Sequence, residues 1–307
     1  MILTVTPNFA VDVTYRVDQV RVGETTAVGS VFRQAGGKGV NAARTLQALG
    51  REVLVTGFAG GVTGEAARAE LSASGLEDET VQVAGSSRTT LIIVDEDGEA
   101  TGFSEPGPEV SADEWASLVA RVRSLLPRSQ AVVLAGSLPP GAPIDGYGEL
   151  ISIAAPTGIP LLLDTHGDAV LHAVAAHPTI VKMNASELAG TVGESEIIVG
   201  ARALRERGAE AVVVSDGANG LVAISEHGIW QAKPPRRLRG NPTGAGDAAS
   251  AALIAGVVDG QNWPELIADA TALSAAAVCA PIAGSFDEGV YRRLREEIVA
   301  VELPVPR

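Results

Sequence analysis

Residues 131–135 read AVVLA, a stretch that is apolar at every position. Three further runs, at residues 161–164, 180–183 and 211–215, are almost as apolar. Strands that are apolar on both faces are typical of a parallel sheet covered by helices, because neither face meets water. Segments with helical spacing alternate with these runs. The sequence therefore predicts an α/β protein with a three-layer α/β/α core and a mostly parallel sheet.

Two other segments, at about residues 9–35 and 86–105, alternate apolar and polar side chains instead; within the first, the alternation is clear over residues 11–17 and looser over residues 26–32. Alternation indicates a sheet with one wet face, and DEDG at residues 95–98 is a hairpin turn signal. These segments do not fit the parallel sheet, so we expect them to form a small, mainly antiparallel lid. We expect a single domain over residues 1–307, with the core formed by the remainder and a loose tail at residues 303–307.

Composition limits the classes of function. The net charge is −14, which argues against a general nucleic-acid binder, since such proteins need a basic surface. A local basic cluster could still bind an anionic small molecule. No apolar run reaches the roughly 20 residues of a membrane span, and the segment after Met1 lacks a basic signal-peptide start. We therefore expect a cytoplasmic protein without a membrane partner.

The glycine-rich segment NPTGAGD at residues 241–247 precedes an Ala-rich predicted helix. Free backbone N–H groups and the helix dipole make such a turn an anion site, and glycine lets the backbone approach a phosphate closely. Asp247, in the first helical turn, could accept the proton of a hydroxyl that attacks phosphorus. Taken alone, the motif favours a simpler interpretation, in which Asp247 only complements the helix dipole.

A second glycine-rich segment, GGKGVN at residues 36–41, also opens a predicted helix. It lacks the spacing of a Walker phosphate loop. Its N–H groups, Lys38 and Asn41 could face a polyhydroxy substrate, or it could be a flexible turn with a solvated lysine. The chain has only three lysines, Lys38, Lys182 and Lys233, so each is worth inspecting as a functional residue.

Polar or glycine-rich turns follow three of the predicted strands. In doubly wound folds, ligands bind at the carboxyl ends of strands, where KMNASE at residues 182–187 lies. Asn184 and Glu187 could share one helix face and hold Mg²⁺ through water. Alternatively, Asn184 is a helix N-cap and Glu187 closes a capping box. The turns SDGANG at residues 215–220 and AGSLPPG at residues 135–141 could each be ordinary.

Together and in this order, GGKGVN and the GAGD of residues 244–247 resemble the PfkB (ribokinase-like) carbohydrate kinase family. The resemblance covers nearly the whole chain, and EPGP at residues 105–108 is similar to the branch that contains 1-phosphofructokinase and tagatose-6-phosphate kinase. It implies a Rossmann-like core, a β-sheet lid through which the chain forms a homodimer, and the use of ATP and Mg²⁺. The resemblance leaves open whether the protein also requires a monovalent cation.

The resemblance also implies a role for each matching residue. Asp247 would be the base, and Gly244, Ala245 and Gly246 would form the anion hole. The other positions divide among substrate, nucleotide and metal: Asp12, Gly37, Lys38, Asn41, Arg88 and Ser137 would bind the sugar or sugar phosphate, Lys182, Asn184, Ser215, Gly217 and Gly220 would approach the nucleotide, and Glu187 would organise Mg²⁺ through water.

The implied reaction transfers the γ-phosphoryl of ATP to a hydroxyl of a hexose phosphate: fructose 1-phosphate, fructose 6-phosphate or tagatose 6-phosphate. Lys38 and Arg88 favour a phosphorylated substrate. Residues 23–28, where this branch often carries a basic side chain, contain none, and Glu24 there would suit a neutral sugar. Alternatives are a kinase for an unphosphorylated sugar or a nucleoside, and a non-catalytic sugar- or nucleotide-sensing protein of the same fold.

Overall fold

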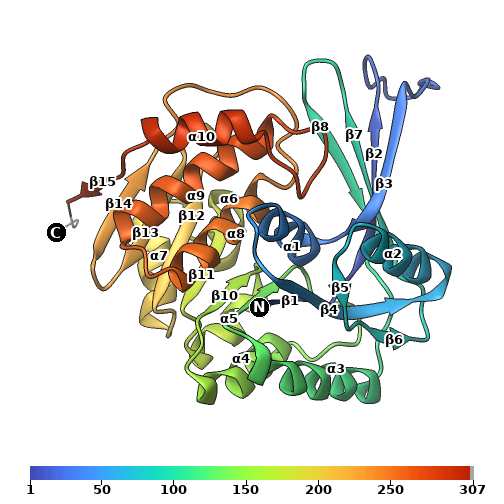
Figure 1. Cartoon of the computed structure of the whole chain (residues 1–307), viewed down its shortest axis with the longest axis horizontal. Helices are drawn as coiled ribbons and strands as arrows, with labels where there is room; N and C mark the ends of the chain where they lie inside the picture. Colours follow the sequence, from blue (N-terminus) through green and yellow to red (C-terminus); the bar gives the residue numbers. More distant parts are fainter. Residues whose placement is uncertain (305–307) are drawn as a thin grey trace.

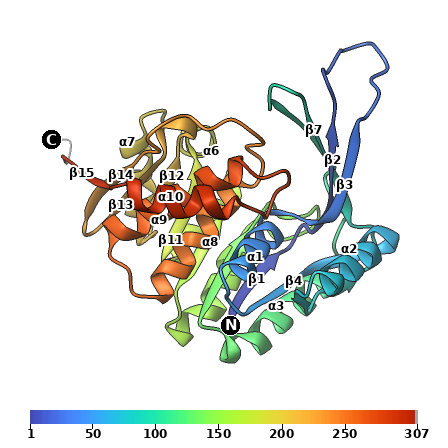
Figure 2. The ribbon, with the colours of Figure 1, turned by 45° about the horizontal axis from the view of Figure 1, so that its top comes forward.

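The structure, a computed structural model that describes residues 1–304, contains two sheets of unequal size (Figures 1 and 2). The larger sheet has eleven strands. In spatial order they are β15 (Val301–Leu303), β14 (Gly228–Ala232), β13 (Leu221–Ser225), β12 (Ala211–Ser215), β11 (Ile180–Asn184), β10 (Leu161–Asp164), β9 (Ala131–Ala135), β1 (Ile2–Thr6), β4 (Val53–Gly60) and β5 (Glu77–Asp78), with β6 (Val81–Val83) also paired to β4.

The predicted parallel core is confirmed. Every pairing from β12 across to β5 is parallel, and only β13, β14 and β15 at one end are antiparallel. The four apolar runs are β9, β10, β11 and β12. Successive side chains of these strands are buried, so the strands are covered on both faces of the sheet. Their sequences are apolar throughout because helices cover both sides.

Helices form the two outer layers, and neighbouring residues of one strand pack against opposite layers. Ile2 of β1 packs with the first group of helices, for example, whereas Leu3 packs with the second. The first group is α1 (Lys38–Ala48), α2 (Gly61–Ala73), α8 (Ala245–Val258), α9 (Trp263–Val278) and α10 (Glu288–Glu297); the second is α3 (Ala112–Leu125), α4 (Gly146–Ala154), α5 (Asp168–Ala173), α6 (Ala185–Val192) and α7 (Ile197–Glu206).

The smaller sheet, called the lid sheet below, has four strands that project from the core (Figure 2). Their order is β3 (Ser30–Gly36), β2 (Ala10–Arg16), β7 (Arg88–Val94) and β8 (Ala100–Ser104). The outer pairs are antiparallel, as the alternation predicts, and β7 and β8 form the expected hairpin. The central pair, β2 with β7, is parallel, and the long connection between its two strands permits this arrangement.

Two local predictions differ from the structure. The loose tail was expected from residue 303, but Leu303 pairs with Ile229 at the sheet edge; residues 305–307 lie outside the described part. Apolar alternation over residues 26–32 also places a lid strand too early, since β3 begins at Ser30 and runs into the glycine pair. No helix among the described residues is long and apolar enough to cross a membrane.

The fold brings the polar segments together at one edge of the large sheet. Register aligns Asp164 with Ala135 and Asn184 with Ser215, so the carboxyl ends of these strands lie side by side. The lid sheet stands at the same edge, because β2 follows β1 after a short turn and β3 leads directly into α1. Strand ends, helix starts and lid strands therefore share one cavity.

Candidate active site

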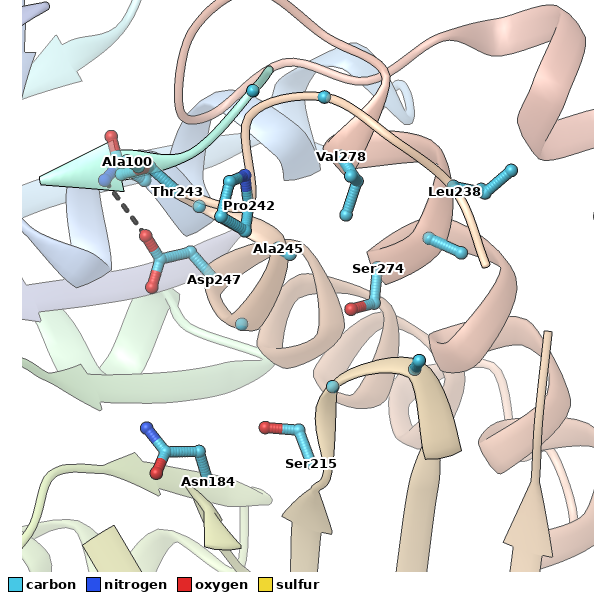
Figure 3. Close-up of a pocket in the computed structure, with 18 of the residues that line it drawn as sticks. Ala100, Asn184, Ser215, Leu238, Pro242, Thr243, Ala245, Asp247, Ser274 and Val278 are labelled. Carbon is cyan, nitrogen blue, oxygen red and sulfur yellow. Dashed lines mark hydrogen bonds between the residues drawn. The ribbon is translucent and has the colours of Figure 1, made fainter. Parts of the chain in front are cut away.

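Asp247 lies in the first turn of α8 and lines a large cavity of about 1140 Å³ (Figure 3). The side chain is almost fully buried. Its Oδ2 accepts a hydrogen bond from Asn41 Nδ2 at 2.9 Å. Burial and the nearby Asp164 carboxylate raise the pKa of Asp247 to about 6, although Lys182, Lys38 and Asn41 partly offset them. Asp247 can therefore exchange a proton near neutral pH.

The turn before Asp247 depends on glycine for two different reasons. Gly244 caps α8 with a φ of 87°, a left-handed conformation that favours glycine. Gly246 has no such constraint, but a Cβ there would lie 2.6 Å from Lys182 Nζ. The Lys182 ammonium thus lies against the backbone of the turn, beside the free N–H groups at the positive end of α8. This arrangement is suited to binding an anion.

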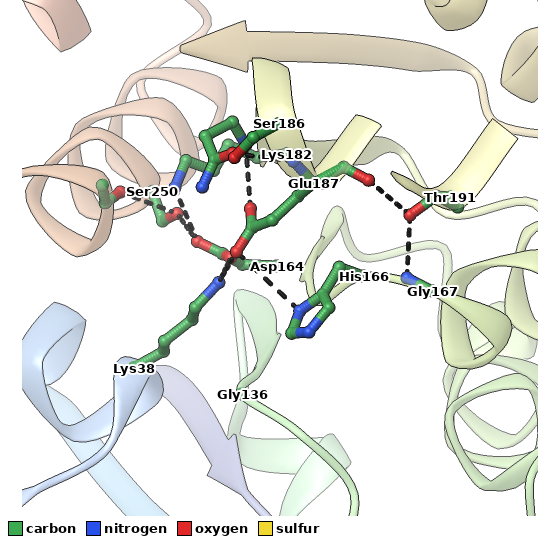
Figure 4. A network of polar contacts seen from close by, with 12 residues as sticks. Lys38, Gly136, Asp164, His166, Gly167, Lys182, Ser186, Glu187, Thr191 and Ser250 are labelled. Atoms are coloured by element: carbon green, nitrogen blue, oxygen red, sulfur yellow. Dashed lines mark hydrogen bonds and ion pairs between the residues drawn. The ribbon is translucent and has the colours of Figure 1, made fainter. Parts of the chain in front are cut away.

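Asp164 is fully buried at the end of β10 and joins two lysines (Figure 4). Its Oδ1 accepts from Lys38 Nζ at 2.9 Å, and its Oδ2 accepts from Lys182 Nζ at 3.0 Å and from Ser250 Oγ at 2.7 Å. Burial opposes ionisation, but the two ammonium groups outweigh it and hold the pKa of Asp164 below its usual range. The carboxylate therefore stays charged and positions both lysines.

Glu187 has the capping-box role that was one of the two predicted interpretations of its segment. It closes a capping box with Asn184, whose backbone N donates to Glu187 Oε2 at 2.8 Å. Its Oε1 accepts from Lys38 Nζ at 3.1 Å. Burial lowers the pKa of Lys38, but Asp164 and Glu187 more than compensate, so the pKa of Lys38 is raised.

Direct metal ligation finds little support in this geometry. Within residues 1–304, no group of three or more His, Cys, Asp or Glu side chains is placed to hold a metal ion. The side-chain oxygen of Asn184 is occupied by its capping bonds to Glu187 and Ser186. Because Mg²⁺ retains several waters and binds few carboxylates directly, a water-mediated role for Glu187 is compatible with the donors present.

The lid sheet contributes Asp12 and Arg88 to the same cavity. Burial raises the pKa of Asp12, although the Gly37 N–H, Asn41 and Arg88 lower it in part. Arg88 donates to Asn8 O at 3.1 Å and to Thr90 Oγ1 at 3.3 Å. Among the described residues, no carboxylate lies within 4.0 Å of its guanidinium, so Arg88 retains donors for an anion.

The structure brings fifteen of the sixteen predicted site residues to this one cavity. Ser137 is the exception: it lies in an adjoining cavity of about 660 Å³, which shares Arg88 and Ser104 with the first. Its hydroxyl accepts from Asn8 Nδ2 at 3.0 Å. The residues that line the large cavity as predicted are Asp12, Gly37, Lys38, Asn41, Arg88, Lys182, Asn184, Glu187, Ser215, Gly217, Gly220, Gly244, Ala245, Gly246 and Asp247.

Asp164, Arg237 and Arg239 are among the residues of the cavity or its supporting network that sequence reasoning missed. Asp164 ends an apolar strand at the carboxyl edge of the sheet, the position where ligand-binding groups gather, and that signal could have identified it. Arg237 and Arg239 line the cavity from the loop before α8. These two arginines could have been identified from the sequence, because they belong to a local cluster of arginines in a strongly negative chain.

A buried carboxylate beside an anion-binding turn, in a cavity that also holds unpaired cationic donors, defines a site for transfer of a phosphoryl group. The pfkB family carbohydrate kinase model matches residues 6–288. The chain therefore belongs to the pfkB family of carbohydrate kinases, and it is an ATP-dependent sugar kinase.

Solved structures resemble this fold over nearly their whole length. Phosphofructokinase-2 from Escherichia coli, in complex with potassium, is 26% identical, with 96% of this chain and 98% of that chain covered and a TM-score of 0.88. A possible 1-phosphofructokinase from Thermotoga maritima is 22% identical, with 99% of both chains covered and a TM-score of 0.90. Arabidopsis thaliana ribokinase, complexed with ribose and ATP, is 21% identical, with 96% of this chain and 98% of that chain covered and a TM-score of 0.75. At their lower identity, the last two show the fold alone.

Proposed function

We propose that the chain transfers the γ-phosphoryl group of ATP to a hydroxyl of a hexose phosphate, with Asp247 as the base. The observation that carries this proposal is the buried Asp247 carboxylate, hydrogen-bonded to Asn41 beside the anion-binding turn of α8. A carboxylate with a pKa of about 6 is ionised at neutral pH and can still accept a proton, which suits a general base.

The transfer is in line. The acceptor hydroxyl lies between Asp247 and the γ-phosphorus, and its proton passes to the carboxylate as the new O–P bond forms and the bond to the leaving diphosphate breaks. The N–H groups of residues 244–246 stabilise charge on the transferred group. Mg²⁺, held through water by Glu187, would neutralise charge on the phosphates. The remaining nucleotide contacts come from Lys182, Asn184 and the turn at residues 215–220, which line the same cavity.

A hexose phosphate is proposed because the cavity contains more cationic side chains than the binding of a neutral sugar would require. Arg88 retains free donors in the cavity, and Asp12 and Asn41 supply acceptors for sugar hydroxyls. Asn41 Oδ1 is buried and has no partner among the described atoms, so it can accept from a bound hydroxyl. Phosphofructokinase-2 from Escherichia coli has been solved with fructose 6-phosphate, at 25% identity to this chain. The unphosphorylated-sugar alternative rests on the absence of a basic residue at 23–28.

The test measures ADP formation with ATP, Mg²⁺ and each of six acceptors: fructose 1-phosphate, fructose 6-phosphate, tagatose 6-phosphate, fructose, tagatose and ribose. Potassium is included, because a monovalent cation was left open and phosphofructokinase-2 from Escherichia coli has been solved in complex with potassium. We expect one hexose phosphate to have the highest kcat/KM. Asp247→Asn should lower kcat by about 10²–10⁴, the usual contribution of a positioned base, with nearly unchanged ATP affinity. Near-normal turnover of that variant would refute the base assignment, and preference for a neutral sugar would refute the acceptor class.

We further propose a homodimer formed through the lid sheet. Val31 and Phe103 of this sheet are large apolar side chains that are more than a third exposed, and the strand register places them on the same face. A second copy covering them would remove apolar surface from water. Light scattering should give a mass near twice 31.3 kDa, and Phe103→Asp should shift it toward the monomer. A measured mass near 31.3 kDa for the wild type, that of a single chain, would exclude this assembly.

A further inference from the structure

Two segments of opposite charge face each other across the mouth of the large cavity. The turn between β7 and β8, called the acidic turn below, reads DEDGE at residues 95–99. The loop before α8 contains RRLR at residues 236–239, called the basic segment below. Three arginines in four positions are a local exception in a chain with a net charge of −14. The pairing of these two segments is therefore not a consequence of the average surface charge.

The two segments meet through their backbones. A Cβ on Gly98 of the acidic turn would lie 3.0 Å from Gly240 O and 3.4 Å from Gly240 Cα, directly after the basic segment. Figure 3 shows the start of β8 at Ala100 beside the loop that carries Thr243. The lid sheet and the core therefore touch at this point, between the acidic turn and the residue that follows the basic segment.

The charged side chains that line the cavity here are not yet engaged. Asp97 and Glu99 of the acidic turn, and Arg237 and Arg239 of the basic segment, are exposed and line the same cavity. Among the described residues, none of these four forms an ion pair within 4.0 Å. Asp95 differs, because its carboxylate accepts from the backbone N of Glu99 inside the turn.

We propose that Asp97 and Glu99 form a charge latch with Arg237 and Arg239, which holds the lid sheet on the core while the acceptor is bound. Opposite charges attract one another within the Debye length, about 8 Å at physiological salt, and the four side chains flank the point where Gly98 lies against Gly240. The latch rests on the proposed function, and it assigns these residues a positioning role, since none of them needs to touch the reacting atoms.

The consequence for the reaction follows from where the acceptor residues are placed. Asp12 and Arg88 lie on lid strands, whereas Lys38, Asn41 and Asp247 belong to the core. The acceptor must contact both groups at once, so opening the lid weakens its binding. The nucleotide-facing residues of β11 and β12 belong to the core and keep their positions. A latch therefore affects the KM for the acceptor far more than the KM for ATP.

Charge reversal separates a latch from direct binding of nucleotide phosphates by the arginines. Three variants are compared: Asp97→Arg with Glu99→Arg, Arg237→Glu with Arg239→Glu, and all four changes together. Each two-residue reversal should raise the acceptor KM about tenfold, because an exposed ion pair contributes a factor of about 1.4–5 and reversal adds repulsion. The four-residue variant restores the attraction with opposite polarity, so its KM should return to within about threefold of the wild type.

Matched controls come from the same two segments. Glu96 and Arg236 carry the same charges but do not line the cavity, so Glu96→Arg and Arg236→Glu should change the acceptor KM less than about twofold. The wild-type KM should rise with salt between 50 mM and 500 mM KCl more steeply than that of either two-residue variant, because salt screens the attraction.

Two results would overturn the latch. If Arg237→Glu with Arg239→Glu raises the KM for ATP and the lid reversal fails to rescue it, the arginines bind nucleotide instead. If all variants keep the wild-type acceptor KM, the charges have no positioning role. Hydrogen exchange of residues 88–104 measures lid opening without turnover and should be faster in each two-residue variant. A chain that lacks kinase activity but shows this pattern would retain the latch while losing the proposed function.

Discussion

The side-chain amide of Asn41 donates a hydrogen bond at 2.9 Å to Asp247, 206 residues further along the sequence, and so joins the first turns of α1 and α8. This bond fixes one oxygen of the buried carboxylate and leaves the other for an acceptor hydroxyl. It also lowers the pKa of Asp247, against the larger effect of burial. Asn41 therefore couples the orientation of the proposed base to its proton affinity.

The pH dependence of turnover should report this coupling. Because the pKa of Asp247 is raised to about 6, the carboxylate is protonated below that pH and cannot accept a proton. We expect kcat to fall about tenfold per pH unit below pH 6. Asn41→Ala removes a hydrogen bond to the charged form, so its acid limb should move to higher pH. Profiles of kcat against pH at saturating substrates measure the acid limb of the wild type and of the variant. If the two acid limbs lie at the same pH, the assigned interaction is contradicted.

Asp164→Asn should strongly destabilise the fold. The substitution leaves the ammonium groups of Lys38 and Lys182 without their shared buried counter-charge, which typically costs about 3–5 kcal/mol. Because the native pKa of Asp164 is lowered, its contribution is present above the unfolded pKa of about 3.9 and is lost as the pH falls below it. Urea unfolding at pH 7 and at about pH 3 should show a smaller difference from wild type at the lower pH, which lies below the unfolded pKa. An equal difference at both pH values contradicts the ion-pair origin.

Gly246→Ala should impair phosphoryl transfer without a large loss of stability. The added Cβ would lie 2.6 Å from Lys182 Nζ, so the flexible lysine moves away from the anion-binding turn. We expect at least a tenfold loss in kcat/KM for ATP, since a charge-assisted hydrogen bond contributes about 1.5–3 kcal/mol. Gly190→Ala is the control, because that position in α6 has no atoms within 4 Å of an added Cβ; it should keep full activity and gain up to about 1 kcal/mol.

Arg88→Met should discriminate between acceptor classes. If Arg88 binds the phosphate of the acceptor, the substitution removes charge-assisted hydrogen bonds and raises the KM for a hexose phosphate about 10–100-fold. The KM for the corresponding unphosphorylated sugar should change less than about threefold. Steady-state kinetics with fructose 6-phosphate and fructose make the comparison. Equal losses for both sugars would assign Arg88 to the transferred phosphoryl group or to lid structure.

The sequence predicts the core of this fold because its strands are buried on both faces and are therefore apolar without interruption. The same reasoning fails at the edges. Residues 301–303 form a strand only because β14 offers an unpaired edge, a tertiary fact that no local pattern contains. The start of β3 is misplaced because alternation continues through the exposed loop before it.

For the candidate site, the two glycine-rich motifs identify seven cavity residues in advance: Gly37, Lys38, Asn41 and the four residues 244–247. Asp164 escapes detection because its role arises from register: β10 and β11 pair in parallel, which sets Asp164 beside Lys182. Ser137 is predicted with the acceptor residues but lies in the adjoining cavity, where it is bonded to Asn8. Both outcomes depend on neighbours that are distant in the sequence.

The parallel pairing of β2 with β7 has a consequence for how the protein is made on the ribosome. Residues 17–87 separate the two strands, so β2 emerges long before its central partner exists. Such non-local pairing is slow and leaves strand edges open to wrong contacts. The part of the site that lies on β2 can therefore form only after β7 has been synthesised. Nascent chains whose β2 edge is still unpaired are the ones most prone to associate with one another.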